Sequence, residues 1–343
     1  MRAVDQLCGL GMAPPASDRA GAAANARTLR HMIIEHPEFT RAVREVASLH
    51  KRWVDCGIAG ALLIVGQSGC GKSTLLKYYL ERFPRVRSAR KTRIPVLRVP
   101  TPEAPTVKSF SEACLVALGD IAAARGSAAV KTQRIIHFIK ECEVDLILVD
   151  EFHHFCDSNS QERRRVTDWL KNLLNECNKP IVLFGLPRAI SALYANEQLR
   201  RRFASPYYYR EFEFKTDEEQ ALFRGLLQQF QTLTDLPWAF QLSQPEVAMR
   251  FHFATNGLID YVVKILDDLV ARFNSSEAER VDYPALQLSF KAQIWADVPE
   301  ALNPFNPKET PRRLDKASEP FSIWDDPKAY TMSKRAMAMG GAK

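Results

Sequence analysis

The sequence predicts an α/β protein in which helices flank a parallel sheet, followed by a small all-helical lid domain. Short apolar runs alternate with helical stretches up to about residue 215, which is typical of strands buried in a parallel sheet. Beyond that residue the strand pattern disappears and only helical spacing remains. A glycine-rich segment also joins an apolar run directly to a helical stretch, an arrangement in which α/β sheets bind phosphate groups.

The elements follow in order along the chain. Residues 1–35 are rich in alanine, glycine and proline and predict a flexible arm, and the sheet domain is expected over 36–215. A first helix is expected over 38–54, because its apolar residues recur at roughly helical spacing. Strands are predicted at 61–65, 94–99, 144–149, 181–184 and 207–214. Further helices of this domain are predicted at 73–83, 107–124, 132–142 and 162–177.

The lid domain is expected over 216–298. Thr216 is a good helix N-cap, and the three acidic residues after it favour the first turn of a helix. Helices are predicted at 217–231, 244–254, 257–273 and 284–295. From residue 299 prolines and charged residues recur without periodicity, so we predict a flexible tail over 299–343.

Composition sets limits on the function. The 343 residues carry a formal net charge of +7, compatible with a nucleic-acid partner and also with a mildly basic surface. None of the seven cysteines forms a Cys-x-x-Cys pair, which argues against a disulfide framework and a zinc site. No apolar run reaches the roughly 18–20 residues of a membrane span. The N-terminus also lacks a signal-peptide pattern, so we expect a cytoplasmic protein with no membrane partner.

A phosphate-binding loop (P-loop) of the form Gly-x-x-x-x-Gly-Lys-Ser/Thr runs from Gly66 to Ser73. Its glycines let the backbone curl so that N–H groups point at an anion, and the following helix adds its positive end. Lys72 is expected to reach the β- and γ-phosphates of ATP, and Ser73 to offer its hydroxyl to Mg²⁺. The predicted cofactor-binding residues of this loop are Gly66, Gln67, Ser68, Gly69, Cys70, Gly71, Lys72, Ser73 and Thr74.

An apolar strand delivers Asp150 and Glu151 to the carboxyl edge of the sheet, where ligands of open α/β sheets bind. Asp150 is expected to hold Mg²⁺, directly or through water, and Glu151 to orient and polarise the attacking water. Together with the P-loop, this pair indicates ATP hydrolysis rather than a solvated acidic strand end. His153 and His154 are conceivable metal ligands, but a structural or water-linked role beside the carboxylates is favoured.

With these motifs the sequence resembles AAA+ ATPases, and most closely the TniB/TnsC family of transposition regulators. The resemblance covers about residues 36–275. The P-loop and the Asp-Glu pair are shared by all AAA+ proteins. The features that narrow the match are Asp-Glu-Phe-His-His at 150–154 and Gly-Leu-Pro at 185–187, and the arginine-rich segment 199–203 and the stretch 102–120 add to the resemblance.

The resemblance implies ATP-dependent assembly of a homo-oligomer, a ring or a helical filament, around double-stranded DNA. It further implies that the assembly links a TniQ-like target-selection protein to a DDE transposase and stimulates insertion. ATP hydrolysis would then disassemble the filament or reset the complex.

The sequence departs from the AAA+ pattern in two places. The strand over 181–184 runs into Phe-Gly-Leu-Pro without the usual polar sensor, and the lid segment 255–260 lacks the usual arginine. Slow hydrolysis, or hydrolysis completed by neighbouring subunits, is therefore expected. Arg200, Arg201 and Arg202 lie where AAA+ proteins carry an arginine finger, and Arg201 or Arg202 is the better candidate; a solvated basic helix end is the alternative.

DNA contacts are expected from loops that line the pore of the oligomer. Lys108 follows a proline-rich loop, and Lys131 and Thr132 lie at the start of a predicted helix. A lysine and a helix N-terminus both suit phosphate binding, so these three residues are DNA-binding candidates. Ordinary exposed lysines are about equally consistent with the pattern.

Two other functions stay open. The missing sensor residues are consistent with a nucleotide-gated scaffold that recruits proteins with little hydrolysis, and its docking segment would be the tail over 299–343. The shared ATP motifs are also consistent with an AAA+ ATPase of another pathway, such as replication initiation, loading or secretion.

Overall fold

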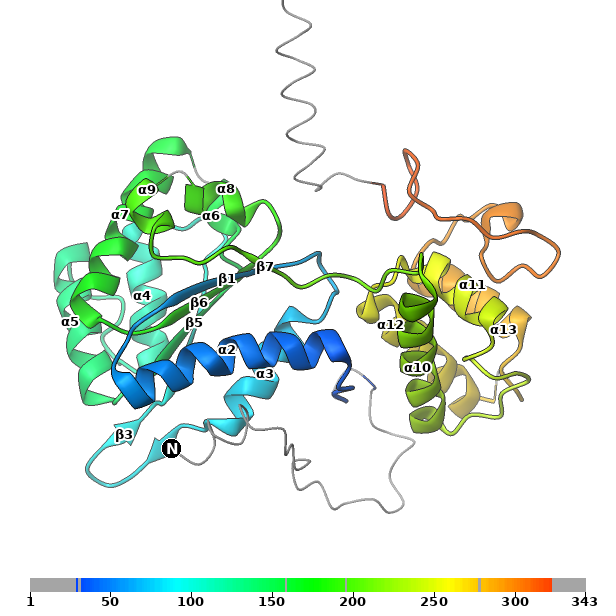
Figure 1. The fold of residues 1–343 in the computed structure, drawn as a ribbon, viewed down its shortest axis with the longest axis horizontal. Coiled ribbons are helices and arrows are strands. Elements are labelled where there is room, and N and C mark those ends of the chain that lie inside the picture. Colours follow the sequence, from blue (N-terminus) through cyan, green and yellow to red (C-terminus); the bar gives the residue numbers. More distant parts are fainter. Residues whose placement is uncertain (1–28, 30–31, 158, 195, 277–278, 323–343) are drawn as a thin grey trace, which may run out of the picture.

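The computed structural model describes residues 29, 32–157, 159–194, 196–276 and 279–322. These residues form a sheet domain and a helical lid domain, which lie beside each other and are joined by the segment after the last strand (Figure 1). The first helix of the lid begins at Asp217.

Five parallel strands form the central sheet, in the order β4-β5-β6-β1-β7. The strands are β1 (Ala61–Val65), β4 (Val96–Pro100), β5 (Leu146–Asp150), β6 (Ile181–Gly185) and β7 (Tyr207–Tyr208). Strands β1, β5 and β6 are buried at every position, as expected for strands with both faces covered. This confirms the predicted parallel sheet.

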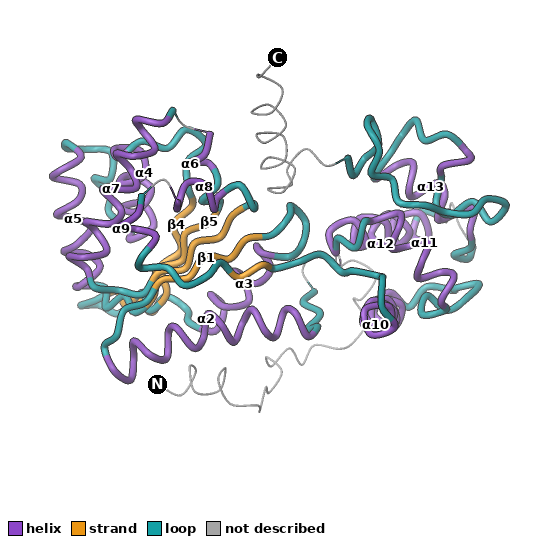
Figure 2. Tube along the Cα trace, turned by 45° about the horizontal axis from the view of Figure 1, so that its top comes forward, coloured by secondary structure: helices purple, strands orange, loops and turns teal. Residues whose placement is uncertain are grey.

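Helices cover both faces of the sheet (Figure 2). On one face lie α2 (Pro37–Cys56) and α3 (Lys72–Arg82), and on the other lie α4 (Val107–Leu118), α5 (Ala128–Glu141), α7 (Ser160–Cys177) and α8 (Ala189–Tyr194). Side chains along a strand point alternately to the two faces, so Leu62 packs with α2 and α3 while Leu63 packs with the opposite group. Each continuous apolar strand therefore contributes side chains to two hydrophobic cores, one on each face of the sheet.

Several element boundaries differ from the predictions. The helix predicted over 107–124 ends at Leu118, because Gly119 adopts a left-handed C-cap with φ +91°. The strand predicted over 207–214 is only two residues long, since the chain leaves the sheet toward the lid. Short elements that the sequence did not reveal include β2 (Val86–Arg87), β3 (Thr92–Arg93), α6 (His154–Asp157) and α8. The helix expected at residues 200–202 is the short α9 (Glu197–Arg200), which ends at Arg200.

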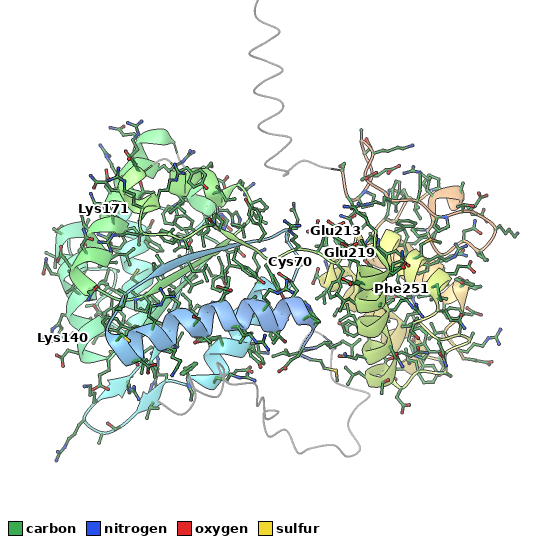
Figure 3. All side chains as sticks on the ribbon, in the orientation of Figure 1. Cys70, Lys140, Lys171, Glu213, Glu219 and Phe251 are labelled. Atoms are coloured by element: carbon green, nitrogen blue, oxygen red, sulfur yellow. The ribbon has the colours of Figure 1, made fainter. Side chains whose placement is uncertain are left out.

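The lid is a bundle of α10 (Asp217–Thr234), α11 (Pro245–Thr255), α12 (Ile259–Asn274) and α13 (Tyr283–Gln293), followed by the short 3₁₀ helix η3 (Glu300–Leu302). Thr216 and Glu219 form the capping box that starts α10, in agreement with the predicted N-cap. Phe251 lies in the interior of this bundle (Figure 3). The lid therefore has a core of its own.

The prediction of a flexible tail from residue 299 is wrong for residues 299–322. Phe305 is fully buried among lid side chains and Leu314 is nearly so. Arg250 of α11, itself buried, donates to the carbonyl oxygens of Pro304 and Asn306, both at 2.8 Å. The sequence did not predict this packing, because the segment contains scattered prolines and packs as irregular chain without any periodicity. Residues 323–343 lie outside the described part of the chain.

The end of the predicted N-terminal arm is also packed. Leu29 is buried against the lid, and its backbone N–H donates to the Asp267 carboxylate at 2.8 Å. Met32 and Ile34 contact the same lid cluster. The rest of the arm, residues 1–28, 30 and 31, lies outside the described residues. Within the described ranges, no helix has the length and apolar character that a membrane span requires.

The buried guanidinium of Arg250 gives a test of the tail. Arg250→Ala should lower the free energy of unfolding by about 2–3 kcal/mol, because several backbone carbonyls lose a charged hydrogen-bond donor. Urea denaturation measures this loss, and limited proteolysis should show earlier cleavage within 299–322. Arg165→Ala, at an exposed position of α7, is the control and should change stability by less than about 0.5 kcal/mol. Equal urea midpoints of unfolding for Arg250→Ala and Arg165→Ala would contradict the packing of residues 299–322.

Candidate functional site

A cavity of about 380 Å³ lies where the P-loop, the carboxyl edge of the sheet and the lid meet. This volume falls in the range of small-ligand sites, roughly 300–1,000 Å³. P-loop residues and Glu151 line its polar end. Side chains of α10, α12 and the segment before α2 line its apolar end.

Glycine is required in the P-loop for two separate reasons. Gly69 and Gly71 have φ angles of +80° and +105°, which side chains other than glycine rarely adopt. At Gly66 the φ angle is ordinary, but a Cβ atom there would lie 2.2 Å from the carbonyl oxygen of Tyr209. The loop therefore curls between β1 and α3, and at Gly66 it packs against Tyr209 with no space for a side chain.

Most predicted cofactor residues line the cavity, namely Ser68, Gly69, Gly71, Lys72, Ser73 and Thr74. The Lys72 ammonium donates to the carbonyl oxygens of Gly66 and Gln67, both at 2.8 Å, which holds its charge inside the loop. Cys70 lies behind the loop in the core, and burial raises the pKa of its thiol. Gly66, Gln67 and Cys70 thus support the loop rather than line the cavity.

The two predicted carboxylates have different surroundings. Glu151 lines the cavity and has a left-handed backbone, with φ +56°. Asp150 is buried; its Oδ2 accepts from Arg98 of β4 at 2.7 Å, and its Oδ1 accepts from the Glu151 N–H at 3.0 Å. A hydroxyl on Ser73 and a carboxylate on Asp150 are the hard oxygen donors that Mg²⁺ prefers, so the residues present fit the predicted ion.

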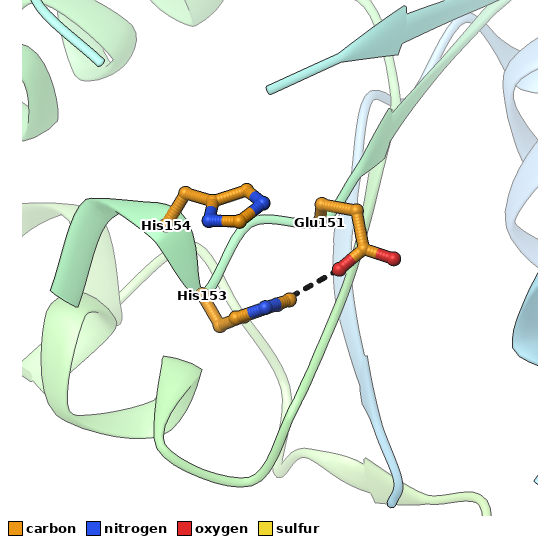
Figure 4. Close-up of side chains that lie close together, drawn as sticks. All are labelled: Glu151, His153 and His154. Atoms are coloured by element: carbon orange, nitrogen blue, oxygen red, sulfur yellow. Dashed lines mark ion pairs between the residues drawn. The ribbon is translucent and has the colours of Figure 1, made fainter. Parts of the chain in front are cut away.

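His153 and Glu151 are in direct contact. The Nδ1 atom of His153 lies 3.2 Å from Oε2 of Glu151, and the Leu186 N–H, just after β6, points at the same nitrogen at 3.4 Å. Burial lowers the pKa of His153 to about 4, with smaller contributions from nearby cations, so the imidazole is neutral at neutral pH. Ligand atoms of Glu151, His153 and His154 all lie within 4.8 Å of one another (Figure 4).

The apolar end of the cavity is the part that sequence reasoning missed. Met32, Ile34, Phe230, Ile259 and Val263 line it, from the N-terminal segment, α10 and α12. An apolar compartment next to a phosphate-binding loop suits the base of a nucleotide. No local motif marks these residues, because they come together only when the lid folds over the sheet domain.

The lid is held directly on the P-loop. The backbone N–H of Asp260, in the first turn of α12, donates to the carbonyl oxygen of Gly69 at 3.1 Å. The Asp260 carboxylate pairs with Lys264 at 2.7 Å. An acidic side chain therefore occupies the lid position where the sequence lacked the usual arginine.

The arginine-finger candidates lie away from this cavity. Arg201 pairs with Glu197 at 2.6 Å and its side chain is 76% exposed, whereas Arg202 donates to Asn175. Neither arginine lines the cavity of its own chain. A role for them at the nucleotide of an adjacent subunit stays a prediction.

The structure corrects two of the three predicted DNA contacts. Lys131 is fully buried, where it pairs with Glu112 at 2.8 Å and donates to the Ala123 carbonyl oxygen. The Thr132 hydroxyl accepts from Trp169 at 2.7 Å and donates to a backbone carbonyl of its own helix. Both side chains connect α4, α5 and α7, so neither is available to a phosphate. Lys108 is exposed in the first turn of α4.

Comparison with known proteins agrees with this architecture. A family model described as Bacterial TniB protein matches residues 26–211, more than half of the chain. The ORC2 protein of Aeropyrum pernix, solved as ADPNP–ADP complexes, has a TM-score of 0.57 at 14% identity, covering 80% of this chain and 74% of that one. Cdc6p of Pyrobaculum aerophilum has a TM-score of 0.57 at 11% identity, with 78% and 70% covered.

The ORC1 protein of Aeropyrum pernix, solved in complex with DNA, has a TM-score of 0.55 at 15% identity, with 76% of this chain and 66% of that one covered. No curated protein sequence matches the chain. At these identities the solved structures show the fold alone, which is that of the AAA+ ATPases with a helical C-terminal domain. The predicted fold class is therefore confirmed.

The tight contact behind Gly66 gives a test of the site. Gly66→Ala should weaken ATP binding by about tenfold or more, a loss of about 1.4 kcal/mol, because the new methyl group forces the loop away from Tyr209. Equilibrium titration with a fluorescent ATP analogue measures this change. Gly225→Ala is the control, since its Cβ in α10 would meet nothing within 4 Å. That control should bind ATP normally and gain about 0.5–1 kcal/mol of stability. Unchanged affinity in Gly66→Ala would contradict the proposed loop geometry.

Proposed function

The chain belongs to the TniB family, and we propose that it is an ATP-hydrolysing regulator of transposition that assembles on duplex DNA. The observation that carries the proposal is a single cavity with a P-loop at one end and an apolar compartment at the other. Glu151 stands at the phosphate end of this cavity. That arrangement suits binding of a nucleoside triphosphate and attack by water on its terminal phosphate.

Each polar group has a role in this proposal. Lys72 and the N-terminus of α3 offset the negative charge of the phosphates. Glu151 orients the attacking water as a general base. Ser73 and Asp150 would hold Mg²⁺, and that ion would neutralise charge on the phosphate oxygens. For Asp150 this means exchange of its contact with Arg98, whose side chain is half exposed and can move into solvent.

Assembly is the second part of the proposal. Arg201 or Arg202 of one subunit would approach the nucleotide of the next, which would make assembly depend on bound ATP. Lys108 would contact the DNA backbone from the start of α4. The ORC1 protein of similar fold was solved in complex with DNA, which supports a DNA partner here. A TniQ-like target-selection protein and a DDE transposase would be the protein partners that the assembly links.

One observation favours a second function, a nucleotide-gated scaffold with little hydrolysis. The residue after β6 is Leu186, and the lid presents Asp260 where many related ATPases carry an arginine. A negative side chain at that position gives a γ-phosphate no added attraction. Measurements of ATP hydrolysis by Lys72 and Glu151 variants separate the two functions.

Lys72→Ala should abolish ATP binding and ATP-dependent assembly on duplex DNA, because the phosphates lose their buried cation. Glu151→Gln should keep binding, slow phosphate release by about 10²–10⁴-fold and prolong the DNA-bound state. A phosphate-release assay and electron microscopy with ATP and DNA measure both effects. Glu176→Gln, a surface change, is the control. Phosphate release unaffected by Glu151→Gln would select the scaffold, and discrete particles without DNA would exclude assembly.

Lys108 can be tested against a lysine on the same domain. Lys108→Ala should weaken DNA binding and reduce the slope of log K against log salt by about 0.9 for each DNA phosphate that the lysine neutralises. Lys140→Ala, at the far end of α5 from Lys131, is the control and should leave the slope unchanged. Fluorescence anisotropy over a salt series measures both. Identical slopes for the two variants would remove Lys108 from the DNA interface.

A further inference from the structure

The Glu151 carboxylate needs a second group to hold it. Its side chain is 45% exposed at the mouth of the cavity, and a half-exposed glutamate exchanges freely among rotamers. A general base must instead stay within hydrogen-bond reach of the water it activates. Among the described residues, His153 is the side chain that pairs with this carboxylate.

His153 is itself fixed on several sides. Its side chain is 7% exposed, and its backbone carbonyl accepts from the Cys156 N–H at 2.8 Å in the turn that starts α6. The preceding residue, Phe152, donates its N–H to the Phe184 carbonyl at 2.8 Å, which ties this turn to β6. A Cβ at position 185 would lie 3.2 Å from the backbone nitrogen of His153, so Gly185 allows the turn to approach closely. The turn that carries the buried imidazole is therefore held in place beside the half-exposed carboxylate.

The two groups that converge on Nδ1 require opposite tautomers. The Leu186 N–H can donate only to an unprotonated Nδ1, whereas the Glu151 carboxylate can accept only from a protonated one. A neutral imidazole can therefore form only one of these two hydrogen bonds at a time. In the structure the Leu186 N–H donates to Nδ1 over a long 3.4 Å, while Oε2 of Glu151 lies 3.2 Å from the same atom at ion-pair distance. A hydrogen bond to an anion is the stronger kind, so a change to the Nδ1–H tautomer exchanges the long Leu186 bond for a stronger one to Glu151.

We propose that His153 is a positioning residue for ATP hydrolysis, whose Nδ1–H donates to the Glu151 carboxylate and aims it at the attacking water. The inference rests on the proposed ATPase function and deepens it. It also accounts for a feature of β6, which runs into Leu186 with no polar side chain of its own. His153 brings a polar group to that place from the turn that follows the neighbouring strand β5, beside Glu151 and in the lining of the cavity.

Another histidine of the same domain provides a matched control. His137 lies on α5, is exposed and is not part of the cavity lining. Its ring contacts Phe138 of the same helix, with ring centroids 5.6 Å apart. Removing His137 therefore removes an imidazole outside the site and leaves the contact between His153 and Glu151 in place.

The first experiment measures steady-state hydrolysis by the full chain with saturating DNA. His153→Ala should lower kcat by about 10–100-fold, the usual cost of losing a group that orients a catalytic residue, and leave the KM for ATP within about twofold. His153→Asn should recover part of kcat, because its amide N–H can donate to the same carboxylate. His137→Ala should match the wild type. An unchanged kcat in a folded His153→Ala variant would overturn the inference.

A double-mutant cycle separates positioning from a general structural effect. If His153 acts through Glu151, His153→Ala should cause no further loss in a Glu151→Gln background. An equal loss in both backgrounds would show an independent effect and overturn the inference. His153→Gln serves if His153→Ala does not fold, and thermal unfolding identifies that case. Absence of hydrolysis in the wild type would refute the proposed function itself, whereas normal hydrolysis in every His153 variant would refute only the positioning role.

Discussion

The close approach of two chain segments to the P-loop, one from the sheet side and one from the lid, is the constraint on which the site depends. Tyr209 leaves no room for a side chain at Gly66, and Asp260 of the lid bonds to the Gly69 carbonyl. The loop is thus held from the sheet side and from the lid side at once. Because the lid contact also brings α12 against the loop, the apolar end of the cavity exists only in this arrangement.

Charge in the site is distributed so that each buried ion has a partner. Lys72 is held by carbonyl oxygens and Asp150 by Arg98, which offsets the cost of desolvating both ions. His153 is neutral, so it can share a buried place with Lys72 without repulsion. Glu151 is partly open to solvent, which suits a residue that must reach a water molecule.

Local patterns predict the elements well and the ends of elements less well. Strand β1, the P-loop and α3 follow from residue type and order, because a glycine loop between an apolar strand and a helix has few conformations. Lys131 is not the surface cation that its place along the chain predicts, since its burial depends on Glu112 from another helix. The packing of 299–322 was not predicted for the same reason. Phe305 and Leu314 pack against side chains of the lid helices, and no residue close to them in sequence indicates these contacts.

The sequence alone determined the α/β class, the P-loop and the Asp150–Glu151 pair, because those features depend on contacts between residues close along the chain. Only the tertiary structure decided the apolar end of the cavity and the pairing of Asp150 with Arg98 of the adjacent strand. These depend on side chains that meet through the lid and through adjacent parallel strands. The spacing of residues along a chain determines periodicity and turns, but it does not specify which surfaces, formed by residues far apart in the sequence, come into contact.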